Sequence, residues 1–442
     1  MTIGIDSGSP HDLLLTGGHV VDVGGGHIGR HDVAVRGGRI AAVAPELPRE
    51  GAREVVDVTG RLVTPGLVDL HTHVHPGATY WGIQPDPVAW HSGVTTWVDA
   101  GSAGAWTIDA LRAAADSFRV RVPALLNISA VGLTGRTGES VDLAHCDVDA
   151  ALDAIARHPD LVVGVKVRID RETVGDHGIR PLERALDVAR AAGLPVMVHV
   201  AAGPPGPADV LPLLRPGDIL THCASGVAAT GAGPVVREAY ARGVLLDVGH
   251  GAGGFAFDVL EEQLAAGLAP HTVSTDLHAR CRYGPVFDMP TTMAKLRAVG
   301  VPLEEVVAAA TARPAAALAL RGGVGTLAVG AVADLAVFAV EAGPVPVVDA
   351  HGQVREAPER LVNEATYVAG RLLPPALPEP PPAWIPLTGA QRAALERRDN
   401  ALRALLGQPL VGPEGLSEQF PRATPETGLG GGPATALPTR EG

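Results

Sequence analysis

Lysine is rare in this chain, and one lysine lies inside an apolar run. Only two of the 35 basic side chains are lysines, and Lys166 stands in the middle of Leu-Val-Val-Gly-Val-Lys-Val-Arg-Ile, residues 161–169. An arginine stays protonated, whereas a buried amine can lose its proton and react. Such an amine can add carbon dioxide and form a carbamate, a carboxylate able to bridge two metal ions. From this run alone, a lysine buried against an acidic partner is an equal interpretation.

Further side chains of metal-binding type stand at the ends of apolar runs. His71 and His73 are separated by one residue, so a strand would place both on one face. Three more such residues close separate runs: His199, His222 and Asp276. Each of these signals is weak by itself, because isolated core histidines are usually structural. Together with Lys166 they would meet at one rim of a parallel sheet, and this coincidence predicts a metal site.

The runs that carry these residues alternate with alanine-rich segments of helical spacing. Strands are predicted at residues 67–73, 95–101, 122–129, 161–168, 195–200, 218–223, 244–249 and 271–276, and helices include 181–192 and 234–242. Eight strands alternating with helices are typical of an α/β fold, the (β/α)8 TIM barrel, whose chemistry lies at the carboxyl ends of the strands. We therefore expect a barrel that carries the metal site over residues 64–319.

The flanks of this region have a different pattern. Short alternating strands broken by glycine occupy residues 13–63 and return at 325–338 and 365–371, as expected for hairpins. We expect residues 1–63 and 320–372 to form one small β-sandwich domain. Residues 373–442 are rich in proline and glycine, and we expect a partly disordered tail with a short helix at 389–406 and no catalytic role.

Composition excludes several classes of partner. The formal net charge is −13 and basic clusters are missing, which argues against a nucleic-acid or anionic-membrane surface. No apolar run reaches the ~20 residues of a membrane span, and Met1–Pro10 lacks the features of a secretory signal. The three cysteines are scattered: Cys146, Cys223 and Cys281. Such cysteine use fits a reducing compartment, so a cytoplasmic protein is expected.

The histidine, lysine and aspartate set, with the segment 64–73, closely resembles the amidohydrolase superfamily, specifically its binuclear members with a carboxylated lysine. The resemblance extends from about residue 13 to 371. It implies a ligand set divided between two divalent ions: His71, His73 and Asp276 on one, His199 and His222 on the other, and Lys166, as its carbamate, between them. Zinc is the first expectation, with manganese or iron as alternatives.

Several segments are similar to the metal-dependent amidohydrolase/deacetylase family, whose members are often described as dihydroorotases. They are residues 93–104, 127–129, 163–168, 247–251, 274–278 and 287–293. The family implies hydrolysis of an amide or ester bond by a metal-bridging hydroxide, with Asp276 as the group that takes and returns the proton. Assembly into a homo-oligomer is common in such families.

The resemblance leaves the substrate open among three functions. The favoured one is deacetylation of N-acetyl amino acids or acetylated 2-hydroxy acids. The second is a cyclic amidase of the dihydroorotase or hydantoinase type. The third is a catalytically silent scaffold, against which the complete set of six ligand-type residues argues.

Arg168 stands two residues beyond Lys166 and should therefore face the same cavity. An arginine there could hold the carboxylate of a small-molecule substrate through two parallel hydrogen bonds. The competing interpretation is that Arg168 pairs with Asp170 or a neighbouring acid. Further candidates for contacting substrate or orienting a ligand are His250, Asn127, Tyr80 and His278.

Overall fold

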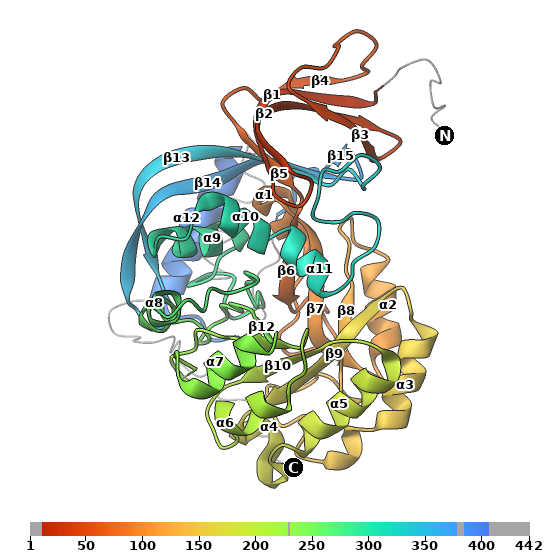
Figure 1. Cartoon of the computed structure of the whole chain (residues 1–442), viewed down its shortest axis with the longest axis vertical. Coiled ribbons are helices and arrows are strands. Elements are labelled where there is room, and N and C mark those ends of the chain that lie inside the picture. The colour runs from red at the N-terminus through yellow and green to blue at the C-terminus, as the bar shows by residue number, and fades with distance from the viewer. Residues whose placement is uncertain (1–10, 229, 378–383, 406–442) are drawn as a thin grey trace, which may run out of the picture.

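The protein is built on two β-sheets, a parallel one and a mixed one (Figure 1). The structure is a computed structural model that describes residues 11–228, 230–377 and 384–405. The expectations for Met1–Pro10 and for the end of the tail, from residue 406, fall outside these ranges. Within them, no helix combines the length and the apolar character that crossing a bilayer requires.

The parallel sheet curls around the centre of the molecule (Figure 1) and runs in the order β12-β11-β10-β9-β8-β7-β6. Its residues are mostly buried, as in β7 and β9, because helices and loops cover both faces. The seven strands are β6 Leu67–Thr72, β7 Val94–Gly104, β8 Ala124–Asn127, β9 Val162–Ile169, β10 Val196–Val200, β11 Ile219–Thr221 and β12 Leu245–Leu246.

The predicted strand at residues 271–276 is not a regular strand. It makes isolated parallel bridges on both sides, Asp247 with Thr272 and Thr72 with Leu277, and thereby joins the two edges of the curled sheet. Local side-chain bonding replaces the ladder, since the Thr275 amide and hydroxyl both donate to Asp69, at 2.9 and 2.6 Å. Asp276 has a φ of 47°, a left-handed conformation that no strand can contain.

Helices follow most strands, and α2, α3 and α5 cover the outer face of the parallel sheet (Figure 1). In α5, Pro181 stands in the first turn, Gly193 forms a left-handed C-cap, and Leu182, Leu186 and Ala189 face the core. The helices are α1 Asp86–Ser92, α2 Ile108–Ala115, α3 Val148–Arg157, α4 Arg171–Val174, α5 Arg180–Ala192, α6 Pro207–Val210, α7 Pro234–Ala241, α8 Phe257–Ala265, α9 Met289–Ala298, α10 Leu303–Ala309, α11 Ala312–Ala317 and α12 Gly389–Leu405.

The two flanks of the chain meet in the mixed sheet. Strand β5 pairs in parallel with β1 and antiparallel with β13, so the N-terminal and C-terminal pieces share one eight-stranded sheet. Its strands are β1 Leu13–Asp22, β2 His27–Arg36, β3 Arg39–Ala44, β4 Val55–Asp57, β5 Leu62–Pro65, β13 Leu335–Val348, β14 Val354–Val368 and β15 Arg371–Leu372.

A sandwich of two sheets, the expected form of these flanks, is not confirmed. The long β13–β14 hairpin does not fold back over the N-terminal strands. It curves away from them down the side of the molecule, and β14 packs against α1 and α9 (Figure 1). The apolar face of the hairpin is therefore covered by helices rather than by a second sheet.

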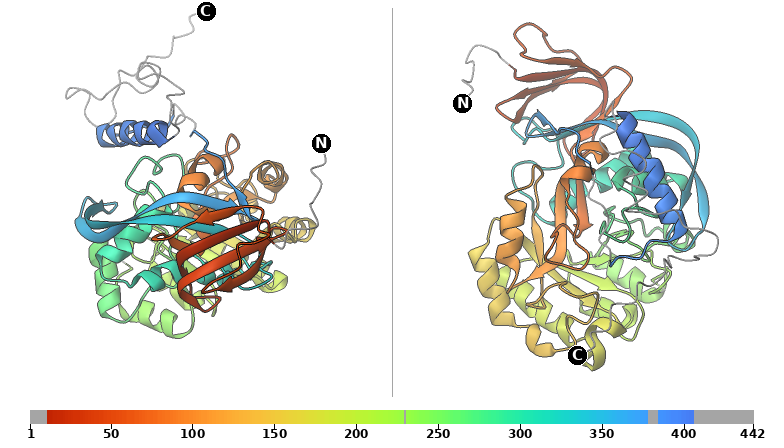
Figure 2. Two further views of the ribbon diagram at one scale, coloured as in Figure 1. Left: turned by 90° about the horizontal axis from the view of Figure 1, so that it is seen from above. Right: turned by 180° about the vertical axis from the view of Figure 1, so that it is seen from behind.

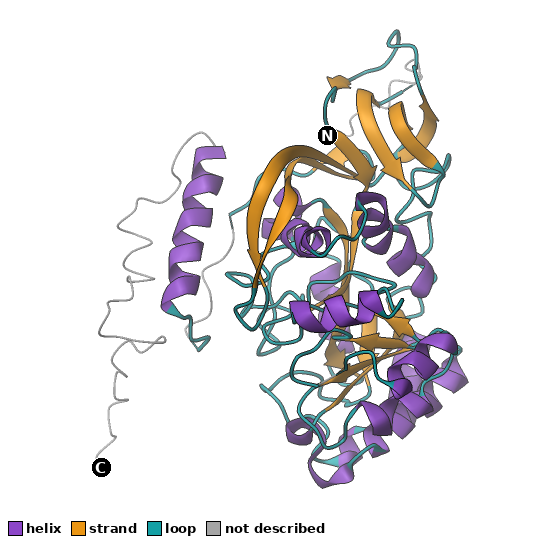
Figure 3. Ribbon diagram, turned by 60° about the vertical axis from the view of Figure 1, so that its left-hand side comes forward, coloured by secondary structure: helices purple, strands orange, loops and turns teal. Residues whose placement is uncertain are grey.

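The tail contributes α12, close to the predicted bounds of 389–406. This helix lies on the outside of the molecule (Figures 2 and 3). The Gln391 side chain donates to the carbonyls of Arg280 and Gly284, at 3.1 and 2.9 Å. Arg398 lies 2.9 Å from Asp288 Oδ2. Helix α12 is thus tied to the segment that follows Asp276.

Candidate active site and metal centre

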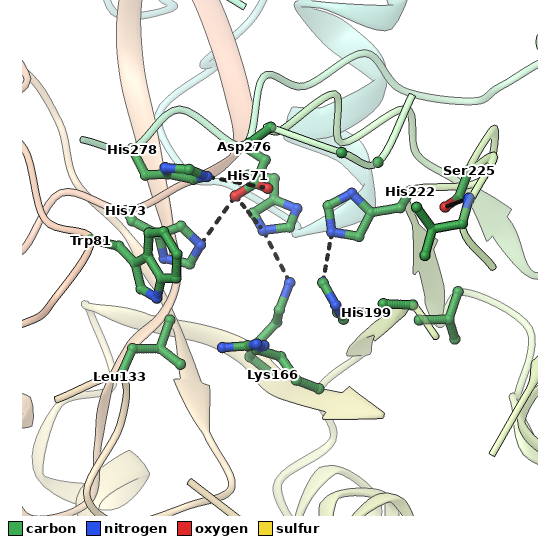
Figure 4. A pocket seen from close by; sticks show the side chains of 17 residues that line it. His71, His73, Trp81, Leu133, Lys166, His199, His222, Ser225, Asp276 and His278 are labelled. Atoms are coloured by element: carbon green, nitrogen blue, oxygen red, sulfur yellow. Dashed lines mark hydrogen bonds and ion pairs between the residues drawn. The ribbon is translucent and has the colours of Figure 1, made fainter. Parts of the chain in front are cut away.

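The carboxyl ends of the curled sheet open into a cavity of about 230 Å3. Residues separated by up to 207 positions converge there, from His71 to His278 (Figure 4). The lining includes the six side chains predicted as metal ligands and two predicted substrate contacts: His71, His73, Lys166, His199, His222, Asp276, Arg168 and His278. Lys166 and Arg168 both reach the cavity from β9, as strand alternation requires.

One half of the site is grouped around the carboxylate of Asp276. Its Oδ1 lies 3.4 Å from Nε2 of His71 and 3.1 Å from Nε2 of His73. The amine of Lys166 lies 3.2 Å from Nε2 of His71. These atoms approach one another from β6, β9 and the segment after β12.

The other half is formed by His199 and His222. Nδ1 of His199 lies 2.7 Å from Nε2 of His222. His71, His222 and Asp276 each offer a ligand atom, and these three atoms lie within 4.8 Å of one another. The two halves are thus close enough to share a bridging group.

Hydrogen bonds behind the cavity fix the orientation of His71. Its Nδ1 lies 2.8 Å from the hydroxyl of Thr221, which donates its proton to Asp247 Oδ2 at 2.8 Å. The hydroxyl can therefore only accept from His71, so Nδ1 carries the imidazole proton. Nε2 then presents a lone pair to the cavity, as a metal-ligating imidazole needs.

His73 is held by the same kind of relay. Its Nδ1 lies 3.0 Å from the hydroxyl of Ser102, which hydrogen bonds to the carboxylate of Asp99. Nδ1 of His222 donates to the carbonyl of Gly249. In these three imidazoles the protonated Nδ1 points away from the cavity and Nε2 points into it, where Nε2 of His222 meets Nδ1 of His199.

Burial keeps the imidazoles neutral. It lowers the pKa of His73 to about 3 and of His222 to about 4, and it places the pKa of His71 and His199 well below the ordinary value. Burial also lowers the pKa of Lys166 to about 7. The amine is therefore partly unprotonated at neutral pH, the form that can add carbon dioxide.

The carboxylate of Asp276 is an acceptor without a donor. Its Oδ1 is buried and has no hydrogen-bond partner, while the nearest nitrogens, on His71 and His73, also present lone pairs. The Lys166 amine reaches Nε2 of His71, but no donor reaches Oδ1 of Asp276 among the described residues. Acceptors that face one another in this way repel unless a cation lies among them. Asp276 and His222 also have positive φ angles, of 47° and 59°, and such strain concentrates at functional sites. The donor set and its geometry fit a divalent cation.

Glycines allow the backbone to approach the site closely. A Cβ on Gly101, whose φ is 81°, would lie 2.6 Å from Cγ of Lys166. A Cβ on Gly251, whose φ is 54°, would lie 2.3 Å from Oδ2 of Asp276. Both positions require glycine for conformation and for space.

Arg168 lies between two acids but is not tightly bonded to either. Its Nε lies 3.6 Å from Glu139 Oε1, and a terminal nitrogen lies 3.9 Å from Asp170 Oδ2. Both distances exceed a hydrogen bond, so the guanidinium retains donors for the cavity. His278 also borders the cavity, with Nε2 4.0 Å from Oδ2 of Asp276.

The other three predicted substrate contacts are not among the residues that line the cavity. Asn127 donates to the Gly101 carbonyl at 3.0 Å and accepts from the Ser129 amide at 2.9 Å, so it orders the backbone beside Lys166. Tyr80 packs edge-on against Trp81, which lines the cavity. His250 is fully buried. Their roles in contacting substrate or orienting a ligand therefore stay predictions.

Several residues of the site carried no assigned role in the sequence. Trp81, Leu133 and Ser225 line the cavity from loops, where no periodicity predicts which side chain points inward. Asp99 and Asp247 accept the hydrogen bonds of the hydroxyls that orient His73 and His71. Both could have been recognised in the sequence, since each is an acid within or directly after an apolar run. Buried acids at such positions are kept only when they are hydrogen bonded.

Together, the curled parallel sheet and the histidine and aspartate cluster at its carboxyl ends place this α/β protein in the class of metal-dependent hydrolases. A family model described as "Amidohydrolase family" matches residues 256–373. The chain belongs to this family, because similarity to curated members extends over most of its length.

Two curated relatives are named deacetylases. The chain is 35% identical over 369 residues to a deacetylase of Agrobacterium fabrum, an alignment that covers 81% of this chain and 90% of the relative. It is 34% identical over 371 residues to a deacetylase of Enterococcus faecalis, covering 82% of this chain and 99% of the relative.

Solved structures carry more varied names. A crystal structure of an adenine deaminase has 34% identity and a TM-score of 0.77, covering 82% of this chain and 99% of that one. A crystal structure of a dihydroorotase has 34% identity and a TM-score of 0.75, covering 81% and 98%. Relatives of similar identity are thus named for different reactions.

Proposed function

We propose that this protein is a binuclear metal-dependent hydrolase that removes the acetyl group from small acids, either N-acetyl amino acids or acetylated 2-hydroxy acids. The observation that carries the proposal is a six-residue ligand set in one cavity with a partly unpaired arginine beside it. The names of the two deacetylase relatives support it.

The ligand assignment is part of the proposal. His71, His73 and Asp276 would hold one divalent ion, His199 and His222 the second, and Lys166, as its carbamate, would bridge them. Zinc suits imidazole, carboxylate and carbamate ligands. When bound, the two ions would polarise the substrate carbonyl and lower the pKa of a water molecule in the site.

Asp276 is positioned to move the proton. During attack on the carbonyl carbon, its carboxylate would accept a proton from the nucleophilic water and donate it to the leaving nitrogen or oxygen. The carbon–nitrogen or carbon–oxygen bond then breaks, which releases acetate and the free amino or hydroxy acid. His278, 4.0 Å from Oδ2 of Asp276, would orient that carboxylate or the leaving group.

The cavity indicates the chemistry of the rest of the substrate. Arg168 supplies a guanidinium for the substrate carboxylate. Apolar side chains form another part of the lining: Trp81, Leu133, Val200 and Val227. A volume of about 230 Å3 suits a small acid with a compact apolar substituent.

A cyclic amidase is the second candidate, favoured by the 34% identity to the structure named a dihydroorotase. It would use the same ligands and differ in receiving a ring rather than an open-chain acetyl group. The two candidate functions therefore differ in their substrate and not in their metal site.

The test is hydrolysis of a matched panel by zinc-loaded protein: N-acetyl-D- and L-amino acids, acetylated 2-hydroxy acids, dihydroorotate and hydantoins. We expect turnover of the open-chain acetyl acids, with one enantiomer preferred. Turnover of only the rings would replace the deacetylase proposal with the cyclic amidase. Activity against none of the compounds would contradict both.

The same panel tests the carboxylate contact through Arg168→Met. We expect KM for the best acid to rise by about tenfold or more, as loss of a charge-assisted pair of hydrogen bonds predicts, while an uncharged ester or amide analogue is unaffected. Arg171→Met is the control, because Arg171 bonds the Gly203 carbonyl outside the cavity. An unchanged KM for the acid would contradict the role of Arg168.

A further inference from the structure

The second lysine of the chain is also buried. Lys295 lies on α9 with 1% of its surface exposed. Its Nζ lies 2.7 Å from Nε2 of His250 and 2.7 Å from the carbonyl of Pro285. Among the ion pairs of the described residues, none involves Lys295. Burial lowers the pKa of this amine to about 7, against the opposing effect of the Asp349 and Asp288 carboxylates. Burying an amine is costly, and here it is retained with two hydrogen-bond acceptors beside the site.

The hydrogen-bond directions around His250 are determined. Nδ1 lies 2.9 Å from the Gly251 carbonyl, so Nδ1 carries the proton and donates it. Nε2 therefore accepts, and the donor is the amine of Lys295. The ring is also stacked on Phe255, which leaves it a single orientation. Lys295, His250 and Pro285 form a directed link, which we call the Lys295 link.

The Lys295 link joins the two segments that flank Asp276. The His250 and Gly251 amides donate to the carbonyls of Ser274 and Thr275, at 3.1 and 2.9 Å, immediately before Asp276. Pro285 belongs to the segment that follows it. Both segments are therefore anchored to the same helical side chain.

The loop that His250 opens forms part of the cavity itself. Residues 252–254 line it. Within residues 250–254, a Cβ on Gly251 would point at Oδ2 of Asp276, and a Cβ on Gly254 would lie 2.4 Å from Nδ1 of His222. A shift of this loop by a fraction of an ångström would therefore reach both side chains. Catalytic geometry is sensitive to shifts of about 1 Å, which can reduce rates on the order of 100-fold.

We propose that Lys295 is a positioning residue for the hydrolysis, one that acts through His250 to hold residues 250–254 against Asp276 and His222. The inference rests on the proposed function for its effect on turnover, but the positioning itself is a property of the fold. An arginine, which the chain uses nearly everywhere else, would bring a wide planar group, whereas the compact ammonium fits between two acceptors.

The test compares Lys295→Met with the wild-type holoenzyme. The variant keeps the length of the side chain and removes the donor. We expect two zinc ions per chain to be retained, kcat to fall by about 10- to 100-fold and KM to change by less than about threefold. Hydrogen–deuterium exchange of residues 249–256 and 274–280 should become faster, and this readout does not depend on the substrate.

Arg297→Met is the matched control on the same helix, since Arg297 pairs with Glu359 at 2.5 Å and not with the site. It should destabilise the protein without the change in kcat or in the exchange of those two segments. His250→Gln removes the imidazole partner of Lys295. It is the second variant for the test if Lys295→Met does not fold. It should reproduce both effects.

Two results would overturn the proposal. One is a wild-type rate of hydrogen–deuterium exchange for residues 249–256 in both Lys295→Met and His250→Gln. The other is the same fall in kcat and the same faster exchange in Arg297→Met. A wild-type enzyme inactive on the whole substrate panel, with faster exchange in Lys295→Met alone, would reject the proposed function and leave the positioning role intact.

Discussion

At the centre of the cavity, Nε2 of His71, Nε2 of His73 and Oδ1 of Asp276 present lone pairs to one another. Their hydroxyl and carboxylate relays prevent the imidazoles from turning their protons inward. Burial disfavours protonation, which is the other way to relieve the repulsion. The residues are therefore organised for a cation before one binds, and we expect the metal to stabilise the fold as well as to support turnover.

Lys166→Ala tests the bridging role at this scale. We expect the variant to lose most bound metal and turnover to fall by about 1,000-fold or more, as removal of an essential active-site group does. Adding a short carboxylic acid together with zinc should restore part of the activity by replacing the bridge. Metal content per chain and turnover are the measurements, and full activity in the simple variant would contradict the binuclear proposal.

At the scale of elements, the site depends on how closely β7 approaches β9. Gly101 lies near the end of β7, and its missing side chain leaves room for Cβ and Cγ of Lys166, which would lie 2.7 and 2.6 Å from a Cβ. Asn127 on β8 holds the Gly101 carbonyl at 3.0 Å. Three adjacent strands therefore determine where the Lys166 amine lies.

Gly101→Ala should displace Lys166. We expect reduced metal content, loss of most activity and a stability loss of about 1–3 kcal/mol from the unfavourable φ. Gly193→Ala is the control, because Gly193 has a φ of 68° with no neighbour within 4 Å of its open side. It should show a similar loss of stability, measured by denaturant unfolding, with wild-type metal content. Equal metal loss in both variants would contradict the argument.

The sequence predicted strands and their end residues better than it predicted loops. Lys166 and Arg168 could be placed because an apolar run of alternating faces determines side-chain direction. The segment at 271–276 could not, because Asp69 and the left-handed Asp276 replace its ladder with side-chain bonds. Strand β12 is shorter than the predicted 244–249 for a related reason, since Gly249 turns the chain with a φ of 48°.

Loop contacts were less accessible to sequence analysis. Asn127 and His250 are polar residues beside the site, but neighbouring backbone groups engage them, and only tertiary structure reveals those partners. Pairing of the flanks across some 270 residues, as between β5 and β13, was indicated by matching patterns. Its single-sheet form depends on where the β13–β14 hairpin packs. The domain boundaries at residues 63 and 320 stay predictions.

At the scale of the whole molecule, α12 connects the tail to the catalytic half of the chain. Arg398 lies 2.9 Å from Asp288 Oδ2 and 3.0 Å from the His91 ring. Asp288 also begins α9, accepting from the amide of Thr291 at 2.9 Å. The tail thus contacts both α1 and the helix that carries Lys295.

Arg398→Met should weaken this attachment. The change leaves the buried Asp288 carboxylate without its cation, and we expect a stability loss of about 1–3 kcal/mol with faster proteolysis within residues 384–405. Arg397→Met, at an exposed neighbouring position, should have neither effect. Thermal melting and timed digestion are the measurements, and identical behaviour of the two variants would show that the ion pair does not anchor the helix.

The near absence of lysine gives the molecule an unusual response to amine-directed reagents. Both lysines have 1% of their surface exposed, and arginine does not react with such reagents under the same conditions. An acylating label can therefore modify a lysine only when the structure around it opens. Mass spectrometry of the labelled peptides would report opening at β9 and at α9 separately. The two lysines are therefore natural probes of local unfolding, one on the strand of the metal site and one on the helix behind it.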